Sequence, residues 1–232
     1  MANKKKARKK QIALWLEGAR LRTLPLAVAP VAIGAGAAAS IQSFNPLLSA
    51  LALAVALFLQ IGVNFANDYS DGIRGTDAKR VGPLRLTASK SVRPSSVKAA
   101  AFAFFALAAV AGLAIVLLTQ IWWLLAVGVA AIIAAWFYTG GKNPYGYAAL
   151  GELSVFIFFG LIATVGTTLI QVKGFWQNDL LLVVTFAGAT AIGLFSSAVL
   201  MVNNIRDIDT DRHVSKKTLA VKVGKRWAKA IY

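Results

Sequence analysis

Long apolar runs alternate with short polar connections along the whole of this 232-residue chain. A helix that crosses a bilayer needs roughly 17 to 25 mainly apolar residues. Six runs have about this length, and they occupy residues 24–41, 44–66, 99–119, 121–138, 147–171 and 180–202. Backbone inside a membrane must satisfy its own hydrogen bonds, so each run is predicted to be a helix. The pattern predicts an all-α, polytopic transmembrane helical bundle with six complete spans.

The polar start of the chain predicts a second kind of element. Residues 1–23 are expected to form a basic tail that ends in an amphipathic helix on the membrane surface over residues 11–23, where Ile12, Trp15 and Leu16 recur at helical spacing. Residues 24–232 then form one transmembrane domain. A cleaved signal peptide is the alternative, although the apolar stretch is long and contains Pro25 and Pro30.

The positive charges are distributed very unevenly. The net charge is +16, and 24 of the 25 Lys and Arg residues fall in the tail and in alternate connections, with Lys173 as the exception. The positive-inside rule makes that face cytoplasmic. The N-terminus and both acidic segments described below are therefore expected on the cytoplasmic side of a plasma (inner) membrane. Topology and attraction to anionic lipid explain the basic excess, so nucleic acid is not an expected partner.

Six of the nine acidic residues lie in two segments, each at the end of an apolar run. In a helix, residues three or four apart share a face, so two columns of oxygen ligands are predicted. The columns consist of Asn64, Asp68 and Asp71, and of Asn203, Asp207 and Asp211. Asp209 lies off its column. Gly72 and Gly75 are expected to end the first helix, which leaves Asp77 in a loop.

Carboxylates so arranged repel one another unless a cation neutralises them. The chain has no Cys and a single His, His213, so the available ligands are oxygens, which favour Mg²⁺. The expected metal ligands are Asp68, Asp71, Asp77, Asp207 and Asp211. A diphosphate held by metal at the membrane edge, with its lipid tail in the bilayer, fits this arrangement. Solvated loop ends are the plain alternative, and a calcium loop fails at Arg212 and Thr218.

The two segments carry recognisable motifs, NDYSDGIRGTD at residues 67–77 and NNIRDIDTD at residues 203–211. With them the chain resembles the UbiA superfamily of intramembrane prenyltransferases, and within it the branch that prenylates 1,4-dihydroxy-2-naphthoate in menaquinone biosynthesis. Residues 22–25, 82–87 and 138–152 match as well, so the likeness covers essentially the whole chain. Members of the family have nine spans, and this chain ends within or just before a seventh. It is therefore expected to be truncated at its C-terminus.

The resemblance implies a Mg²⁺-dependent reaction between two substrates. A polyprenyl group passes from polyprenyl diphosphate to 1,4-dihydroxy-2-naphthoate, diphosphate and CO₂ leave, and a demethylmenaquinone results. Asp68, Asp71, Asp207 and Asp211 are the implied catalytic residues, and the aromatic rings of Tyr138, Tyr145 and Tyr147 could stabilise the allylic cation. An aromatic belt at the interface is an equal alternative for these tyrosines. Membrane lipid surrounds the domain, and no obligate protein partner is implied.

Further residues complete the expected site. Lys142 and Glu152 are added to the catalytic group, with Glu152 either orienting the naphthoate, assisting its deprotonation, or pairing with Lys142. The residues expected to hold the cofactor and its diphosphate are Asn64, Asn67, Asn203, Asn204, Arg22 and Lys217, with Lys216 as the alternative to Lys217. A UbiA-type enzyme with another acceptor, 4-hydroxybenzoate or homogentisate, stays open. A membrane cation transporter is the alternative from a different class.

Overall fold

The computed structural model describes residues 2–76, 84–214 and 216–232, and in this part of the chain every regular element is helical. The principal helices are α1 (Ala2–Ala19), α2 (Pro25–Ser40), α3 (Pro46–Arg74), α4 (Pro94–Thr119), α5 (Leu124–Phe137), α6 (Gly151–Val155), α7 (Ala163–Leu169), α8 (Asp179–Arg206), α9 (Ile208–His213) and α10 (Leu219–Ile231). Short helical turns join them at η1 (Leu21–Thr23), η2 (Tyr145–Tyr147), η3 (Phe156–Ile162) and η4 (Phe175–Gln177).

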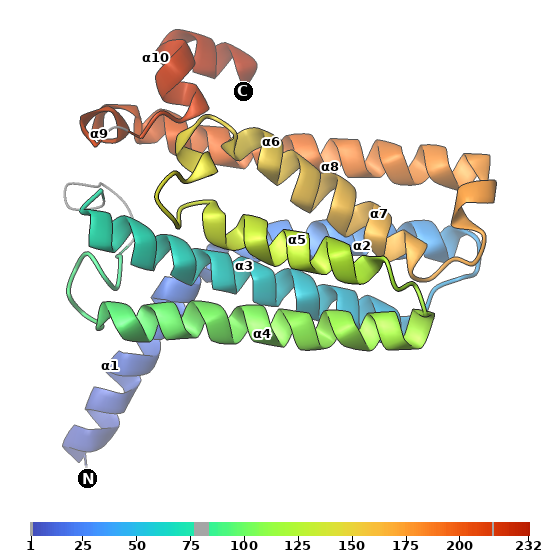
Figure 1. Ribbon diagram of the computed structural model, residues 1–232, viewed down its shortest axis with the longest axis horizontal. Helices are drawn as coiled ribbons and strands as arrows, with labels where there is room; N and C mark the ends of the chain where they lie inside the picture. Colours follow the sequence, from blue (N-terminus) through green and yellow to red (C-terminus); the bar gives the residue numbers. More distant parts are fainter. Residues whose placement is uncertain (1, 77–83, 215) are drawn as a thin grey trace.

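The long helices run side by side and form one bundle (Figure 1). α3 packs on α4, and α2 packs on α3, α7 and α8. Local sequence sets the helix starts: the Asn45 side chain accepts the Leu48 N–H at 3.0 Å with Pro46 next to it, and Asn178 accepts the Leu181 N–H at 3.0 Å. Such caps satisfy backbone donors that the first turn of a helix leaves open.

All six predicted runs are helical, but they are not six equal spans. Within the described residues, four helices are long and apolar enough to cross a membrane: α3, α4, α8 and the continuous segment from α6 to α7. A fifth is reached if α2 is counted with the bent N-terminal helix before it. α5 has only 14 residues. The all-helical membrane fold is therefore clear, and the number of crossings found by length is four or five.

The fifth predicted run differs most from its prediction. It was expected over residues 147–171, whereas its helix begins at Gly151 and is interrupted by the π-helical segment η3. Two glycines explain how η3 approaches α8 so closely. A Cβ atom on Gly160 would lie 2.7 Å from the Gly193 Cα atom, and one on Gly193 would lie 2.7 Å from the Phe156 ring. Contact of backbone with backbone requires glycine at this crossing.

The outer surface of the bundle is apolar, as a lipid-facing surface must be. Large side chains such as Leu180, Val183 and Phe195 are 75%, 67% and 71% exposed. The interior instead contains small residues and hydroxyl groups, among them Ala38, Ala189 and Thr168. Helix association in lipid depends on such close packing, because apolar side chains gain little by moving from lipid into the protein.

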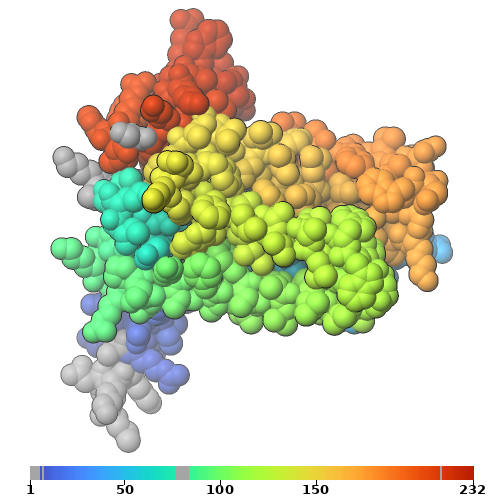
Figure 2. All heavy atoms as spheres, in the orientation of Figure 1, coloured from blue at the N-terminus to red at the C-terminus, as the bar shows by residue number. Residues whose placement is uncertain are grey.

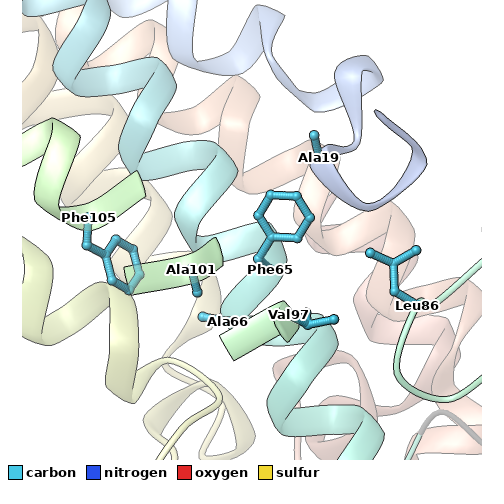
Figure 3. Packing of buried hydrophobic residues seen from close by; sticks show 7 residues of the cluster. All are labelled: Ala19, Phe65, Ala66, Leu86, Val97, Ala101 and Phe105. Atoms are coloured by element: carbon cyan, nitrogen blue, oxygen red, sulfur yellow. The ribbon is translucent and has the colours of Figure 1, made fainter. Parts of the chain in front are cut away.

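The two terminal segments extend beyond the bundle at the same end (Figure 1 and Figure 2). α1 begins well before the predicted residue 11 and docks through Ala19 against Phe65 and Leu86, in the cluster that Figure 3 shows. The Trp15 ring packs on Phe65 with 5.5 Å between centroids. At the other terminus α10 is broken at Gly224, whose φ is +82°. α10 is a basic amphipathic helix and is not among the helices apolar enough to span.

Candidate active site

The two acidic segments lie at the same end of the bundle, one at the end of α3 and the other at the junction of α8 and α9 (Figure 1). The first segment remains helical to Arg74, and Gly75 ends it with φ +74°. Gly72 does not break the helix, contrary to the prediction. Its role is steric, because a Cβ atom there would lie 2.5 Å from the Thr87 side chain. The following loop can thus pack directly on the helix.

Asp68 is fully buried, and its carboxylate holds that loop. Oδ2 accepts the Leu86 N–H and Oδ1 accepts the Thr87 N–H, each at 2.8 Å. Two backbone donors aimed at one carboxylate stabilise its charge. Each carboxylate oxygen keeps a further lone pair, so the arrangement gives Asp68 an anchoring role without removing its capacity to bind a cation.

Asp71, one turn further along, is also buried and has different partners. The Tyr147 hydroxyl donates to Oδ1 at 2.7 Å, and an Arg85 guanidinium nitrogen lies 3.9 Å from Oδ2. Burial, and then the charge of Asp71, raise the pKa of the Tyr147 hydroxyl above its ordinary value. Tyr147 therefore keeps its proton near neutral pH and remains a donor to the carboxylate.

The second segment follows the predicted four-residue step with an interruption. α8 ends at Arg206 and α9 begins at Ile208, so Asp207 lies between two helices. The Asp207 N–H still bonds to the Asn203 carbonyl at 3.1 Å, and the Asp211 N–H to the Asp207 carbonyl at 2.8 Å. Both carboxylates are buried, at 7% exposure each, whereas Asp209 is exposed. Asn203, Asp207 and Asp211 are therefore still joined by the four-residue backbone hydrogen bonds that the predicted column requires.

Basic side chains accompany the second pair of carboxylates. Arg206 forms two hydrogen bonds to Asp207, at 2.7 and 2.9 Å. The Lys216 ammonium lies 3.7 Å from Asp211 Oδ1 and 5.3 Å from the centre of the Tyr147 ring. The Tyr147 hydroxyl donates to Asp71. The Tyr147 side chain therefore connects the two acidic segments, because it contacts Asp71 directly and Asp211 through Lys216.

The backbone and a second cation strengthen this connection. The Lys217 N–H donates to the Tyr147 carbonyl at 3.0 Å. The Arg74 guanidinium lies 5.5 Å from the centre of the Tyr147 ring and donates to the carbonyls of Thr139 and Gly141. The region around Tyr147 thus combines buried carboxylates with basic side chains, which suits a metal-bound anion such as a diphosphate.

The predicted asparagines of the first segment turn toward other helices. Asn64 donates to the Ala19 carbonyl at 2.9 Å and to the Thr23 hydroxyl at 3.1 Å, so it fixes the elbow after α1. Asn67 accepts the Thr139 hydroxyl at 2.7 Å. Both side chains hold neighbouring segments around the carboxylates.

The asparagines of the second segment separate from one another. Asn203 donates to the Val199 carbonyl at 3.1 Å on the same helix. Asn204 is buried and donates to Glu152 Oε1 at 2.8 Å. Glu152 is thereby brought beside the second acidic segment, and the alternative pairing with Lys142 does not occur.

The remaining predicted site residues are more exposed and make fewer contacts. Arg22, Lys142 and Lys217 are exposed, and within the described part of the chain the side chain of Lys142 makes no hydrogen bond or ion pair. Lys216 rather than Lys217 contacts an acidic partner. Asp77, the fifth expected metal ligand, lies outside the described residues.

A metal would need ligands beyond the protein side chains seen here. In residues 2–76, 84–214 and 216–232, no three Asp, Glu, His or Cys side chains gather into a metal-binding group. The donor chemistry nevertheless fits Mg²⁺, because Asp71, which accepts from Tyr147, and Asp211, which pairs with Lys216 beside the Tyr147 ring, both supply buried carboxylate oxygens. Mg²⁺ typically takes one or two carboxylates and completes its octahedron with water and substrate phosphate.

Three functional contacts were missed by the sequence interpretation. Arg85 was recognised only as part of a matching stretch, Tyr147 only as an aromatic ring, and Lys216 only as an alternative. The available signal was the position of Arg85 as the one basic residue in the matching stretch GPLRLT at residues 82–87, shortly after the first acidic motif. Each of these three residues makes its contact only because a loop packs back against the acidic segments. The spacing of residues along the sequence does not predict such packing.

Comparison with known proteins identifies the family of this chain. The model of the UbiA prenyltransferase family matches residues 27–232. The chain belongs to the UbiA prenyltransferase family. The match confirms the family that the two sequence motifs indicated. A 1,4-dihydroxy-2-naphthoate octaprenyltransferase of Mycobacterium tuberculosis is 51% identical over 221 residues, which cover 95% of this chain and 73% of that protein. The Escherichia coli enzyme of the same name is 40% identical over 90% of this chain and 68% of its own length.

A solved structure shares the family fold. It is a UbiA homolog from Archaeoglobus fulgidus bound to DMAPP and Mg²⁺, with a TM-score of 0.66 and 16% identity. The match covers 94% of this chain and 72% of that one. The helical bundle is therefore a UbiA bundle, and that homolog binds a prenyl diphosphate with Mg²⁺.

Proposed function

We propose that this chain catalyses transfer of a polyprenyl group from polyprenyl diphosphate to 1,4-dihydroxy-2-naphthoate. The observation that supports this most is the pair of buried acidic segments connected through Tyr147, in a chain 51% identical to an enzyme of that name. In the reaction the allylic C–O bond of the donor breaks, a C–C bond forms to the naphthoate ring, and the ring loses its carboxylate as CO₂. The product is demethylmenaquinol, the reduced form of demethylmenaquinone.

Asp71, Asp207 and Asp211 are the proposed ligands of Mg²⁺, with Asp68 held behind them as the anchor of the loop. Asp77 is proposed as a further ligand on its motif position alone. Mg²⁺ supplies Lewis-acid stabilisation of the diphosphate leaving group when it is bound. The protein contributes fixed carboxylates, and Tyr147 orients Asp71 through the hydroxyl that donates to it.

Basic residues take the rest of the diphosphate charge in this proposal. Arg85, Arg206 and Lys216 already lie beside the carboxylates, so they need little movement to reach phosphate oxygens. Lys142 and Arg22 are exposed at their sites, and they are proposed only as outer contacts. Water must be kept from an allylic cation, and the apolar bundle beneath the carboxylates meets that need.

The proposed setting is a plasma (inner) membrane with both acidic segments on the cytoplasmic side. The basic tail, the connections before α4 and after α8, and the acidic residues share one end of the bundle (Figure 1). We propose that α2 and the short α5 also cross the membrane, which gives six crossings. Membrane lipid is then the neighbour of the exposed apolar side chains.

One assay tests the function. The detergent-purified protein is incubated with octaprenyl diphosphate and 1,4-dihydroxy-2-naphthoate, with Mg²⁺ or with EDTA, and prenylated product is detected by mass. Product should require Mg²⁺, and Asp71→Asn and Asp207→Asn should each lower kcat/KM at least about 100-fold, since each removes a charge from the metal site. Asp209→Asn, an exposed change in the same motif, is the matched control.

Parallel reactions with 4-hydroxybenzoate and homogentisate examine the acceptor. Product from one of these in place of the naphthoate would reject the acceptor and keep the prenyl transfer. A folded protein that forms no product from any of the three would reject the proposed function.

A further inference from the structure

Glu152 is fixed in an unusual way at the start of α6. Its side chain is 9% exposed, and Oε1 accepts the Asn204 amide at 2.8 Å. Its backbone carbonyl accepts the Ser197 hydroxyl at 2.8 Å. The other carboxylate oxygen, Oε2, is buried and has no hydrogen-bond partner among the described residues. Glu152 is therefore hydrogen-bonded to α8 through Oε1 and its backbone carbonyl, while Oε2 has no hydrogen-bond donor among the described residues.

An open carboxylate oxygen in a buried position costs free energy, because it loses hydration without gaining a donor. Within residues 2–76, 84–214 and 216–232, no cationic side chain pairs with Glu152. A protein that needed only to join α6 to α8 could use Gln or an apolar residue at lower cost. An ionisable group retained under these conditions at a membrane edge indicates a ligand that supplies the missing donor.

The surroundings of Glu152 place that ligand beside the two acidic segments. Tyr138 is within electrostatic range of Glu152, Asp71 and Asp211. Its hydroxyl lies only 3.1 Å from the position that a Cβ atom on Gly151 would occupy. Tyr138 is thus near Glu152 and near one carboxylate of each acidic segment. Asn204, which binds Glu152, is itself part of the second segment, so Glu152 belongs to the region of the carboxylates proposed to hold the donor diphosphate.

We propose that Glu152 Oε2 accepts a hydrogen bond from a ring hydroxyl of the aromatic acceptor, and that Asn204 is the positioning residue that holds this carboxylate. The inference deepens the proposed function and rests on it. A hydroxyl is a donor, as the open oxygen requires. The acceptor's own carboxylate is repelled by Glu152 and turns toward the basic side chains. The hydrogen bond also moves electron density into the ring, which favours attack on the prenyl carbon.

The physical alternative is a clamp between α6 and α8 with no role toward substrate. Kinetics separate the two. A hydrogen bond to a charged group contributes a factor of about 10 to 100 in affinity. Glu152→Gln, which keeps the shape of the side chain, should lower kcat/KM for the naphthoate by this factor while KM for octaprenyl diphosphate changes less than twofold. A clamp would instead lower thermal stability and affect both substrates alike, and that result would overturn the proposal.

The positioning role has its own test. Asn204→Ser should raise KM for the naphthoate several-fold, with KM for the diphosphate unchanged, because the carboxylate loses its orientation. Asp179→Asn is the control for Glu152→Gln: it also removes a carboxylate charge, in an exposed residue at the opposite end of α8, and should leave both KM values unchanged. Equal acceptor KM values in wild type and Asn204→Ser would remove Asn204 from the proposal.

A substrate series keeps the inference testable if Glu152→Gln does not fold. In the wild-type protein, binding of 1-hydroxy-2-naphthoate and of 2-naphthoate is compared by quenching of tryptophan fluorescence. The hydroxylated compound should bind about tenfold more tightly, because only it carries a hydroxyl that can donate to Glu152 Oε2. Equal binding of the two compounds to wild type would overturn the proposal. Failure of the proposed function is a separate result, namely no product from any acceptor.

Discussion

Lys216 and Lys217 are adjacent in sequence but differ in their surroundings. Lys216 lies against Asp211 and the Tyr147 ring, whereas the side chain of Lys217 is exposed. Because a charged contact with phosphate is typically worth about a factor of ten or more, Lys216→Ala should raise KM for the prenyl diphosphate about tenfold. Lys217→Ala should change it less than twofold. Steady-state kinetics on both variants measure the difference, and equal effects would place the diphosphate elsewhere.

Asp68 provides a second prediction at this scale. Its two oxygens hold the Leu86 and Thr87 amides, and an asparagine side chain can accept only one of them. Asp68→Asn should therefore lower stability by about 1–3 kcal/mol, even without Mg²⁺. The check is the apparent melting temperature in detergent with EDTA. Asp209→Asn, at an exposed site, should leave it unchanged, and an unchanged value for Asp68→Asn would mean that the loop is held by other contacts.

At the scale of single helices, glycine residues determine how closely one helix packs on another. Gly160 and Gly193 let η3 meet α8, whereas a Cβ atom on Gly166 in the same span would meet nothing within 4 Å. Gly160→Ala should therefore cost about 1–3 kcal/mol through overpacking. Gly166→Ala should be neutral or slightly stabilising, since alanine favours a helix. Thermal unfolding of both variants in detergent compares them, and equal stability would show that η3 can shift without cost.

At the same scale, the apolar runs predicted where the helices lie but not how each one is interrupted. Residues 44–66 and 180–202 became α3 and α8. α3 is extended by the polar turns that carry Asp68 and Asp71, whereas α8 ends at Arg206, just before Asp207. The π-helical segment in the fifth run was not foreseen, because it results from the contact between Gly160 and Gly193 rather than from local propensity. The length of α5 was also overestimated, because Trp122 and Trp123 are apolar but belong to the turn before the helix.

The same limit applies to the candidate site. Helical spacing correctly placed Asp68 and Asp71 on one buried face, since side-chain direction follows from backbone geometry. Spacing could not tell that Asp68 binds loop amides or that Asn204 turns to Glu152. Those partners come from distant parts of the chain, and their identity depends on tertiary packing.

The orientation of the whole molecule can be tested because the chain contains no cysteine. Ser95→Cys lies at the start of α4 and Gln177→Cys in η4, both at exposed sites at opposite ends of the bundle. With α4 starting on the cytoplasmic side, a membrane-impermeant maleimide should label Gln177→Cys in intact cells. Ser95→Cys should be labelled only after permeabilisation. The reverse pattern would invert the proposed topology.

The docking of α1 has a consequence for biosynthesis. Leu86, one of the residues that receives Ala19, follows it by 67 positions in the sequence. At a synthesis rate of about 5–20 residues per second, the receiving surface emerges roughly 3–13 s after the helix itself. During that interval the apolar side of α1 has only lipid to cover it, while its lysines are drawn to anionic headgroups. The first helix made by the ribosome therefore waits on the membrane until the segment after α3 has been made.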